Sequence, residues 1–273
     1  MKNVLSIAGS DSSGGAGIQA DLKTMCAFGV YGMTAVTAIT AQNTQGVYGV
    51  QEITPALVAG QIEAVYQDIR VDAVKIGMVF QADIIRAVRE SLTRFQAKNI
   101  VLDPVMVSKS GCELMRSEAL PAIRELLAIA DVVTPNIPEA ELICGFPVQT
   151  ESDMQAAAEK MRDMGAKNIL VKGSHRLGND AVDLLFSGGK FIKLQTRRID
   201  TKHTHGTGCT LSSAIACRLA LGDSVEDAVR AAKDYITQAI NDAYPVGGGT
   251  GPVGHLTALY RKAGIQTNGG KYV

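Results

Sequence analysis

The sequence lacks a net charge, a long apolar run and paired cysteines, and each absence excludes a class of protein. Lys+Arg and Asp+Glu both number 27 in 273 residues, so no net field draws the chain toward nucleic acid or a lipid surface. The longest uncharged stretch, residues 25–51, is broken by threonine, glutamine and asparagine and lacks the continuous apolar length that a bilayer demands. We therefore expect a small-molecule partner, with no nucleic acid and no membrane.

The five cysteines form no recognisable pair. They are odd in number, widely scattered and without a C-x-x-C motif, which argues against a disulfide framework or a zinc ribbon. They are Cys26, Cys112, Cys144, Cys209 and Cys217. The apolar run within residues 1–9 is too short for the centre of a signal peptide and leads into a glycine-rich loop, so it predicts a first strand. These features fit a reducing compartment, and we expect a cytoplasmic protein.

Short apolar runs alternate with amphipathic runs along almost the whole chain. This alternation is what a mostly parallel sheet covered by helices requires. The predicted strands are residues 4–8, 34–41, 73–76, 100–102, 132–134 and 169–171. The predicted helices are residues 18–28, 55–68, 82–94, 117–128 and 152–164, the last with Ser152 as its N-cap. Right-handed crossovers then give a doubly wound α/β sheet.

The C-terminal third predicts a hairpin and two further helices. Apolar runs at 181–186 and 191–195 flank Ser187-Gly188-Gly189-Lys190, a turn composition that indicates a hairpin at the edge of the sheet. One helix is predicted from Gly206 to about Gly222, and a second, capped by Ser224, to about residue 243. Without a repeat or a linker, residues 1–273 are expected to form one domain, with 264–273 as a loosely held tail.

The loop at residues 9–17, Gly-Ser-Asp-Ser-Ser-Gly-Gly-Ala-Gly, follows the first predicted strand, where an open parallel sheet binds its ligands. Its glycines let a ligand approach the backbone at the start of the next helix. No Gly-Lys-Ser/Thr follows, and the second strand ends in Gln42-Asn43 without an acidic residue for a ribose, so neither a P-loop nor a dinucleotide site is indicated. A tight strand-to-helix turn explains the loop equally well.

Gln42 closes the second predicted strand. Its amide offers a donor and an acceptor, which suits a ring nitrogen beside an exocyclic amine, as on the edge of a pyrimidine. Asp21 lies within the first predicted helix, about one turn from the glycine-rich loop. It could accept a hydrogen bond from a substrate hydroxyl or amine, or it could be a solvated helix carboxylate.

Two carboxylates, an amide and a cation follow the next strands. Asp103 ends the fourth strand, Asn136 and Glu139 follow the fifth, and Lys172 ends the sixth. Magnesium phosphates favour carboxylate and amide oxygens, and a lysine at the same edge can meet nucleotide phosphates. Asp103 and Asn136 could instead cap helices, and Lys172 could be a surface lysine. Jointly they favour function.

The sharpest signal is Thr204-His205-Gly206-Thr207-Gly208-Cys209-Thr210, which leads directly into an apolar helix. Such a helix N-terminus holds an anion without a charged side chain and can stabilise a phosphoryl group in transfer. Cys209 lies in this electropositive first turn, where we expect the pKa of a thiol to fall. Cys217 is better explained as a buried structural cysteine. His203 and His205 have no further ligands nearby in the sequence, so no metal site is expected there.

With these residues in place, the chain closely resembles the hydroxymethylpyrimidine/phosphomethylpyrimidine kinases, a branch of the ribokinase-like superfamily that includes the pyridoxal kinases. The resemblance covers nearly the whole chain. Its motifs are Ala8-Gly9-Ser10-Asp11, Gly14-Gly15-Ala16-Gly17-Ile18-Gln19-Ala20-Asp21, Ala41-Gln42-Asn43-Thr44, Lys75-Ile76-Gly77-Met78, Asp103-Pro104-Val105-Met106, Thr134-Pro135-Asn136 with Glu139, Thr204-His205-Gly206-Thr207-Gly208-Cys209 and Gly251-Pro252-Val253-x-His255.

The resemblance implies a ribokinase-like three-layer sandwich, ATP with Mg²⁺, commonly a homodimer, and phosphorylation of 4-amino-5-hydroxymethyl-2-methylpyrimidine and its monophosphate for thiamin biosynthesis. It also assigns the site residues. The pyrimidine would be held by Gln42, Asp21, Gly9 and Met78. An anion hole would form from Gly206, Thr207, Gly208 and Cys209. MgATP would be faced by Lys172, Asn136, Asp103 and Glu139, with Asp103 and Glu139 as the metal ligands.

Cys209 stands where sugar kinases of this fold usually have an aspartate base, a departure that the resemblance leads us to expect in this branch. The thiol could deprotonate the substrate, which is the role we favour, or the anion hole and the metal could do most of the work. A pyridoxal kinase or a dual-specificity enzyme is the nearest alternative, although Gln42 favours the pyrimidine. A cysteine hydrolase that uses His205 or His255, or an inactive ligand sensor, fits the glycines and charges less well.

Overall fold

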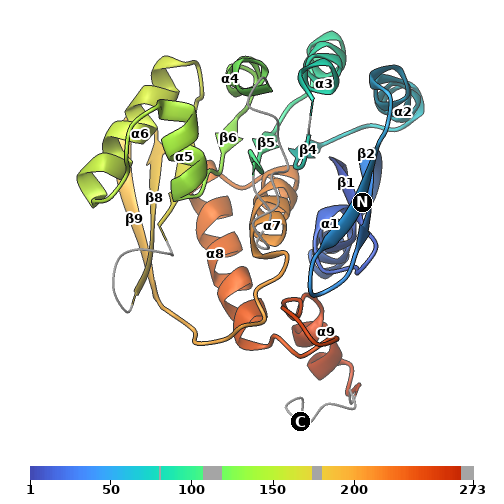
Figure 1. The fold of residues 1–273 in the computed structure, drawn as a ribbon, viewed down its shortest axis with the longest axis vertical. Coiled ribbons are helices and arrows are strands. Elements are labelled where there is room, and N and C mark those ends of the chain that lie inside the picture. Colours follow the sequence, from blue (N-terminus) through green and yellow to red (C-terminus); the bar gives the residue numbers. More distant parts are fainter. Residues whose placement is uncertain (80, 107–118, 174–179, 266–273) are drawn as a thin grey trace.

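The structure is a computed structural model that describes residues 1–79, 81–106, 119–173 and 180–265. Within these residues, nine strands form one sheet in the order β3-β2-β1-β4-β5-β6-β7-β8-β9 (Figure 1). The strands from β2 to β7 in this order are parallel, whereas β3, β8 and β9 are antiparallel to their neighbours. Their bounds are β1 (Asn3–Asp11), β2 (Tyr31–Gln42), β3 (Val47–Glu52), β4 (Ala73–Ile76), β5 (Ile100–Leu102), β6 (Val132–Val133), β7 (Ile169–Lys172), β8 (Asp180–Ser187) and β9 (Lys190–Arg197).

Helices cover both faces of the sheet, which gives three layers (Figure 1). One face packs against α2 (Pro55–Asp68), α3 (Ala82–Arg94), α4 (Leu120–Leu127), α5 (Ile137–Cys144) and α6 (Glu151–Asp163). The other packs against α1 (Gly17–Ala27), α7 (Thr207–Leu221) and α8 (Val225–Asn241). The short α9 (Thr257–Lys262) lies near the C-terminus. The expected α/β sandwich with a mostly parallel sheet is therefore confirmed.

The predicted bounds agree closely where local chemistry marks them. For α2, Thr54 accepts a hydrogen bond from the Leu57 N–H, and a proline follows the cap. Gly188 and Gly189, with φ of +57° and +77°, form the predicted hairpin turn between β8 and β9. Ser224 caps α8 as expected, by accepting from the Asp227 N–H.

One predicted cap and three missed elements need correction. Ser152 is not the N-cap of α6, because Thr150 accepts from the Asp153 N–H and the Asp153 carboxylate accepts from the Thr150 N–H. This reciprocal capping box places the N-cap two residues earlier, and the start of the helix one residue earlier, than predicted. Strand β3 and helices α5 and α9 were not predicted: β3 contains a glycine within a short run, and α5 and α9 have only eight and six residues.

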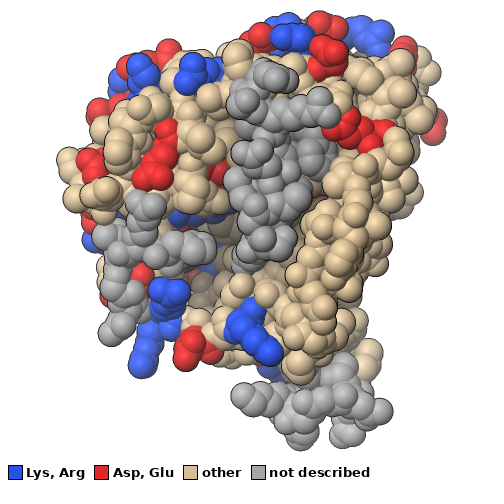
Figure 2. All heavy atoms as spheres, viewed as in Figure 1, with Lys and Arg blue, Asp and Glu red and all other residues tan. Residues whose placement is uncertain are grey.

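The outer surface over the helices mixes both signs of charge, as the space-filling view shows (Figure 2). Exposed ion pairs join Arg86 to Asp83 and Arg94 to Glu63 on α3 and α2. No helix within the described ranges is long and apolar enough to cross a membrane. The four described cysteines form no disulfide; Cys112, the predicted helix start at 117–118 and most of the predicted tail lie outside the described residues.

Candidate active site

The glycine-rich loop between β1 and α1 is organised by Asp11. The Asp11 carboxylate accepts hydrogen bonds from the backbone N–H groups of Ser13, Gly15 and Ala16, at 2.8, 3.1 and 2.8 Å. Burial alone would raise the pKa of Asp11, but hydrogen bonds from His205, Ser13 and backbone amides hold the pKa well below its usual range. The loop is therefore a tight turn around a buried, ionised carboxylate.

A second glycine turn, at the start of α7, packs directly on the first. Gly206 precedes α7 with φ of +81°, and a Cβ at this position would overlap the carbonyl oxygen of Gly15. The Gly17 N–H also donates a hydrogen bond to the sulfur of Cys209. Because the two turns interlock, the first turn of α7 has a fixed place beside the ends of β1 and β2.

The smaller of two described cavities, about 160 Å³, opens between these turns. All the predicted site residues except Asp21 line it: Gly9, Gln42, Met78, Asp103, Asn136, Glu139, Lys172, Gly206, Thr207, Gly208 and Cys209. Eight further residues line it that were not assigned as site residues: Ser10, Asp11, Ala16 and Gly17 of the glycine-rich loop, and Thr40, Val47, Val105 and His205. The strand ends and the two glycine turns thus converge, as predicted.

His205 is the most informative of the missed residues. Its Nε2 lies 2.8 Å from Asp11 Oδ2 and 3.3 Å from Gln42 Nε2, so the ring connects the glycine-rich loop to the end of β2. Gln42 Oε1 also accepts from the Thr40 hydroxyl at 3.1 Å. The signal available in the sequence was the position of His205 immediately before Gly206, at the start of the sharpest motif. The amide of Gln42 is therefore held in place by two neighbours.

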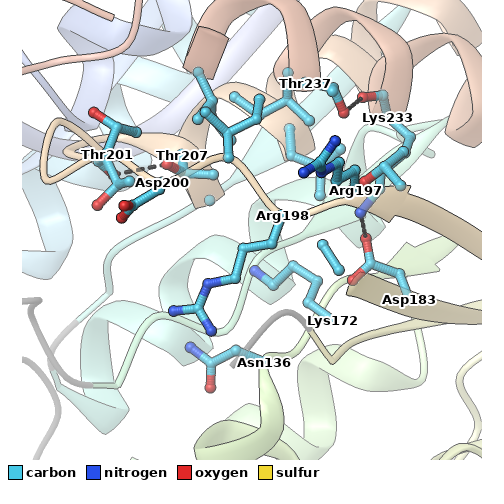
Figure 3. Close-up of a pocket in the computed structure, with 18 residues that line it drawn as sticks. Asn136, Lys172, Asp183, Arg197, Arg198, Asp200, Thr201, Thr207, Lys233 and Thr237 are labelled. Carbon is cyan, nitrogen blue, oxygen red and sulfur yellow. Dashed lines mark hydrogen bonds and ion pairs between the residues drawn. The ribbon is translucent and has the colours of Figure 1, made fainter. Parts of the chain in front are cut away.

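The larger cavity, about 320 Å³, lies on the other side of Lys172 and Gly208 (Figure 3). Asn136, Lys172, Thr207 and Gly208 line both cavities. Its other polar side chains come from β8, the end of β9, the segment after β9 and α8: Asp183, Thr196, Arg197, Arg198, Asp200, Thr201, Thr204, Lys233 and Thr237. Lys233 and Asp183 form a buried ion pair, 2.6 Å long, in its wall (Figure 3). None of the five charged side chains in this set, Asp183, Arg197, Arg198, Asp200 and Lys233, was predicted.

Asp103 is the most densely bonded carboxylate where the cavities meet. It accepts from Lys172 Nζ at 2.9 Å, from Thr134 Oγ1 at 3.1 Å and from Ser212 Oγ at 3.2 Å. Burial opposes its ionisation, yet the cations of Lys172 and Lys75 keep the pKa of Asp103 below its usual range. Asp103 is thus an ionised carboxylate that lines the smaller cavity and binds Lys172, a residue that lines both cavities.

Glu139 and Asn136 cap α5 and line the smaller cavity at the same time. Asn136 Oδ1 accepts from the Glu139 N–H at 2.9 Å, and Glu139 Oε2 accepts from the Asn136 N–H at 2.8 Å. Burial raises the pKa of Glu139 to about 7, although the Lys172 cation opposes the shift. Asn136 and Glu139 therefore cap a helix and line the cavity, two roles that the sequence alone presented as alternatives. With Asp103, Glu139 supplies the hard oxygen donors that a Mg²⁺ ion prefers.

The environment of Cys209 differs from the expectation. Burial raises the pKa of the Cys209 thiol above its ordinary value, and the nearby carboxylates of Asp21 and Asp103 add to the effect. The Lys75 cation and the Gly17 N–H lower it only in part. The predicted fall in pKa is therefore wrong, because desolvation outweighs the position in the first turn of the helix. The thiol form prevails near neutral pH.

Asp21 lines neither cavity. Its carboxylate is fully buried and accepts from Ser6 Oγ at 2.6 Å, from Lys75 Nζ at 2.9 Å and from Ser213 Oγ at 2.7 Å. The solvated helix carboxylate considered from the sequence is therefore excluded. The structure brings Gln42, Gly9 and Met78 together in the smaller cavity but places Asp21 beneath it.

Comparison with known proteins gives one consistent answer. Residues 11–254 match the family model described as phosphomethylpyrimidine kinase. The hydroxymethylpyrimidine/phosphomethylpyrimidine kinase of Streptomyces coelicolor is 51% identical over 257 residues, which cover 94% of this chain and 95% of that protein. The thiamine biosynthesis bifunctional protein ThiED of Geobacter sulfurreducens is 50% identical over 257 residues. They cover 94% of this chain but 52% of that protein, so the chain spans about half of its length.

A solved structure shares the fold. The pyridoxal kinase of Bacillus subtilis, crystallised as an ADP complex, superposes with a TM-score of 0.88 at 41% identity. The superposition covers 94% of this chain and 98% of that one.

Proposed function

This chain belongs to the phosphomethylpyrimidine kinase family, and on that premise we propose that it transfers phosphoryl groups from ATP to 4-amino-5-hydroxymethyl-2-methylpyrimidine and to its monophosphate, for thiamin biosynthesis. The observation that carries the proposal is the junction of two cavities. Phosphoryl transfer needs a donor site and an acceptor site that meet where the phosphoryl group moves. Here four residues, Asn136, Lys172, Thr207 and Gly208, line both.

The larger cavity suits the nucleotide. It has twice the volume of the smaller one, and it is lined by four cationic side chains, Lys172, Arg197, Arg198 and Lys233, and two carboxylates, Asp183 and Asp200. This excess of positive charge suits a ligand that carries negative charge. Its inner wall is closed by the apolar Leu211, Ile236 and Ile240, which can pack against an aromatic base. The triphosphate would then extend toward Lys172 and the first turn of α7.

The smaller cavity suits the acceptor ring. Met78 lies against Gly9, where any side chain would overlap it, so the ring would lie between apolar surfaces. At the end of β2, Gln42 offers an amide to the polar edge of the ring. The hydroxymethyl group of the acceptor would point toward Cys209 and Gly208.

In the transfer step, an acceptor oxygen attacks the γ-phosphorus, and the bond from that phosphorus to the β,γ-bridging oxygen breaks, which leaves ADP. The attacking oxygen belongs to the hydroxyl group in the first transfer, whose proton is released to solvent, and to the phosphate group in the second. The N-terminus of α7 and Lys172 would stabilise the charge on the moving group. Asp103 and Glu139 would hold the magnesium ion, which neutralises phosphate charge when it is bound. Because burial raises the pKa of the Cys209 thiol, this residue would have to lose its own proton before it could act as a base, whereas the anion hole is already formed.

A pyridoxal kinase is the second candidate, because the superposed solved structure is one. Both acceptors carry a hydroxymethyl group on a six-membered ring, and Gln42 is the residue that favours the pyrimidine. The homodimer, the cytoplasmic location and the loosely held tail stay predictions.

The test is transfer from MgATP to hydroxymethylpyrimidine, to its monophosphate and to pyridoxal in parallel. We expect turnover on both pyrimidines to exceed that on pyridoxal. Cys209→Ala should lower kcat by less than the roughly 10²- to 10⁴-fold that general bases supply. A larger loss would assign the base to Cys209, a preference for pyridoxal would favour the second candidate, and no transfer to any acceptor would exclude the kinase function.

A further inference from the structure

The buried carboxylate of Asp21 connects four separate elements beneath the smaller cavity. Asp21 belongs to α1, and its partners Ser6, Lys75 and Ser213 belong to β1, β4 and α7. Both oxygens of Asp21 lie 2.9 Å from Lys75 Nζ, and both side chains are 0% exposed. The carboxylate is thus fully paired in a site from which water is excluded.

Stability alone does not explain such a pair. Removing two charges from water costs several kcal/mol per ion, and well-packed apolar residues of similar volume often serve a fold as well or better. Gly77 leaves room for the ammonium, since a Cβ there would lie 2.6 Å from Lys75 Nζ. A buried ion pair that needs a glycine beside it indicates a role beyond packing.

The pair is linked to the first turns of α7. Ser213 lies four residues after Cys209, so both side chains are on the same face of the helix. The neighbouring Ser212 bonds to Asp103 at 3.2 Å, and Thr210 bonds to His255 Nε2 at 2.9 Å. Contacts from Thr210, Ser212 and Ser213, which lie within about one helical turn, therefore anchor the proposed anion hole, and Ser213 is the anchor that reaches the buried pair.

We infer that Asp21 and Lys75 are positioning residues for phosphoryl transfer: Lys75 fixes the Asp21 carboxylate, and Asp21 holds the first turns of α7 through Ser213. This inference rests on the proposed function. Neither residue lines either of the two cavities described above, so we place neither in contact with a substrate. Preorganised donors accelerate a reaction only if they are held in place before the charge develops, and a shift of about 1 Å can cost roughly 100-fold in rate.

The chain offers a matched pair of variants. Ser6 and Ser213 are both fully buried and both donate to the same carboxylate, at 2.6 and 2.7 Å, but only Ser213 belongs to α7. We expect Ser213→Ala to lower kcat by about tenfold with both KM values within about twofold, since one lost hydrogen bond is worth about 1.4 kcal/mol. Ser6→Ala should keep kcat within about twofold of the wild type. Equal losses of kcat in the two variants would overturn the inference.

A second measurement does not depend on the reaction. Amide hydrogen exchange at residues 207–210 should be faster in Ser213→Ala than in Ser6→Ala, although both lose one bond to Asp21. Equal exchange in the two would overturn the inference even if the wild type transferred phosphate to none of the acceptors. If the wild type transferred phosphate but the two variants exchanged equally fast, the positioning role would be excluded and the proposed function would stand.

A double variant removes the charges without leaving one unpaired. Asp21→Asn with Lys75→Met retains side-chain size, and such replacements are often tolerated by the fold. We expect it to unfold cooperatively on heating and to lose at least as much kcat as Ser213→Ala. Wild-type kcat in the folded double variant would overturn the inference.

Discussion

The two cavities that meet at Lys172 and Gly208 are built from different parts of the chain. Glycine turns, strand ends and short hydrogen bonds to backbone form much of the smaller cavity, in which Gly206 packs on the Gly15 carbonyl and Asp11 binds three backbone amides. Charged side chains from β8, the end of β9, the segment after it and α8 form much of the larger one.

This difference predicts two kinds of response to substitution. Where two backbone segments are already in van der Waals contact, there is no space for an added atom. A substitution at the smaller cavity should therefore cause a large, abrupt loss of activity. Exposed side chains such as Arg198 act mainly through charge, and they should change nucleotide affinity by degrees. The variants below test this comparison, from the largest expected effect to the smallest.

Gly206→Ala should have the largest effect. Its Cβ would separate the two interlocked glycine turns and displace the anion hole, so we expect kcat to fall by about 1,000-fold, the upper range for loss of an oxyanion donor. Gly222→Ala is the control, because Gly222 ends the same helix at φ of +105° with open space around it. That variant should lose about 1 kcal/mol of stability and little activity. Similar losses of kcat in the two variants would refute the comparison, and thermal unfolding would show whether each is folded.

Acid should loosen the anchor of α7 through His255. Burial, with smaller contributions from the charges of Lys23 and His205, lowers the pKa of His255 to about 4. Below pH 6.5, the ordinary pKa of histidine, His255 becomes protonated in the unfolded chain but stays neutral in the folded chain. The free energy of unfolding therefore decreases as the pH falls from about 6.5 to 4. The loss should approach about 3 kcal/mol.

The measurement is the unfolding free energy of the wild type minus that of His255→Gln, by denaturant titration at pH 6.5, 5.5 and 4.5. The subtraction is needed because Glu139, whose pKa is raised to about 7, contributes stability that grows as the pH falls over a similar window. A difference that does not change with pH would contradict the buried neutral histidine.

Gln42→Ala should act on the acceptor alone. Loss of the amide that faces the ring should raise the acceptor KM by roughly 10- to 30-fold, the effect of one or two hydrogen bonds, with the ATP KM within about twofold. Gln45→Ala is the matched control, since Gln45 is an exposed glutamine in the next turn that lines neither cavity. Steady-state kinetics with each substrate varied would detect the difference. An unchanged acceptor KM would remove Gln42 from the site.

Arg198→Ala should have the smallest effect, and it should act on the KM for ATP instead of the KM for the acceptor. Loss of one partly solvated cation should raise the ATP KM by about threefold to tenfold and leave the acceptor KM unchanged. Arg162, which pairs with Asp163 on the surface of α6, provides the control. If Arg162→Ala raised the ATP KM as much, the effect of Arg198 would be a general one of net charge.

The sequence predicted the parts of the site that depend on neighbouring residues. Gly206-Thr207-Gly208 and Gln42 could be placed because a helix start and a strand end have local signatures. The ion pair of Asp183 and Lys233 joins residues 50 positions apart, and no local pattern predicts it. Of the larger cavity, the sequence therefore predicted only the four residues that it shares with the smaller one, Asn136, Lys172, Thr207 and Gly208.

The same limit explains Asp21 and Cys209. The bonds of Asp21 reach Lys75 and Ser213, 54 and 192 residues away, and these partners turn an apparent surface carboxylate into a buried one. For Cys209, the first turn of a helix predicts a lowered pKa, but burial depends on what the fold packs around the thiol. Burial of charge is a property of the tertiary structure, and a local motif does not report it.

The most direct test of the account is one set of initial rates, with MgATP and hydroxymethylpyrimidine each varied, for the wild type, Gln42→Ala and Arg198→Ala. Two cavities with separate ligands predict transfer by the wild type, a raised acceptor KM in Gln42→Ala alone and a raised ATP KM in Arg198→Ala alone. If either variant moved the KM of the other substrate instead, or if the wild type transferred no phosphate, the assignment of the two cavities would be wrong.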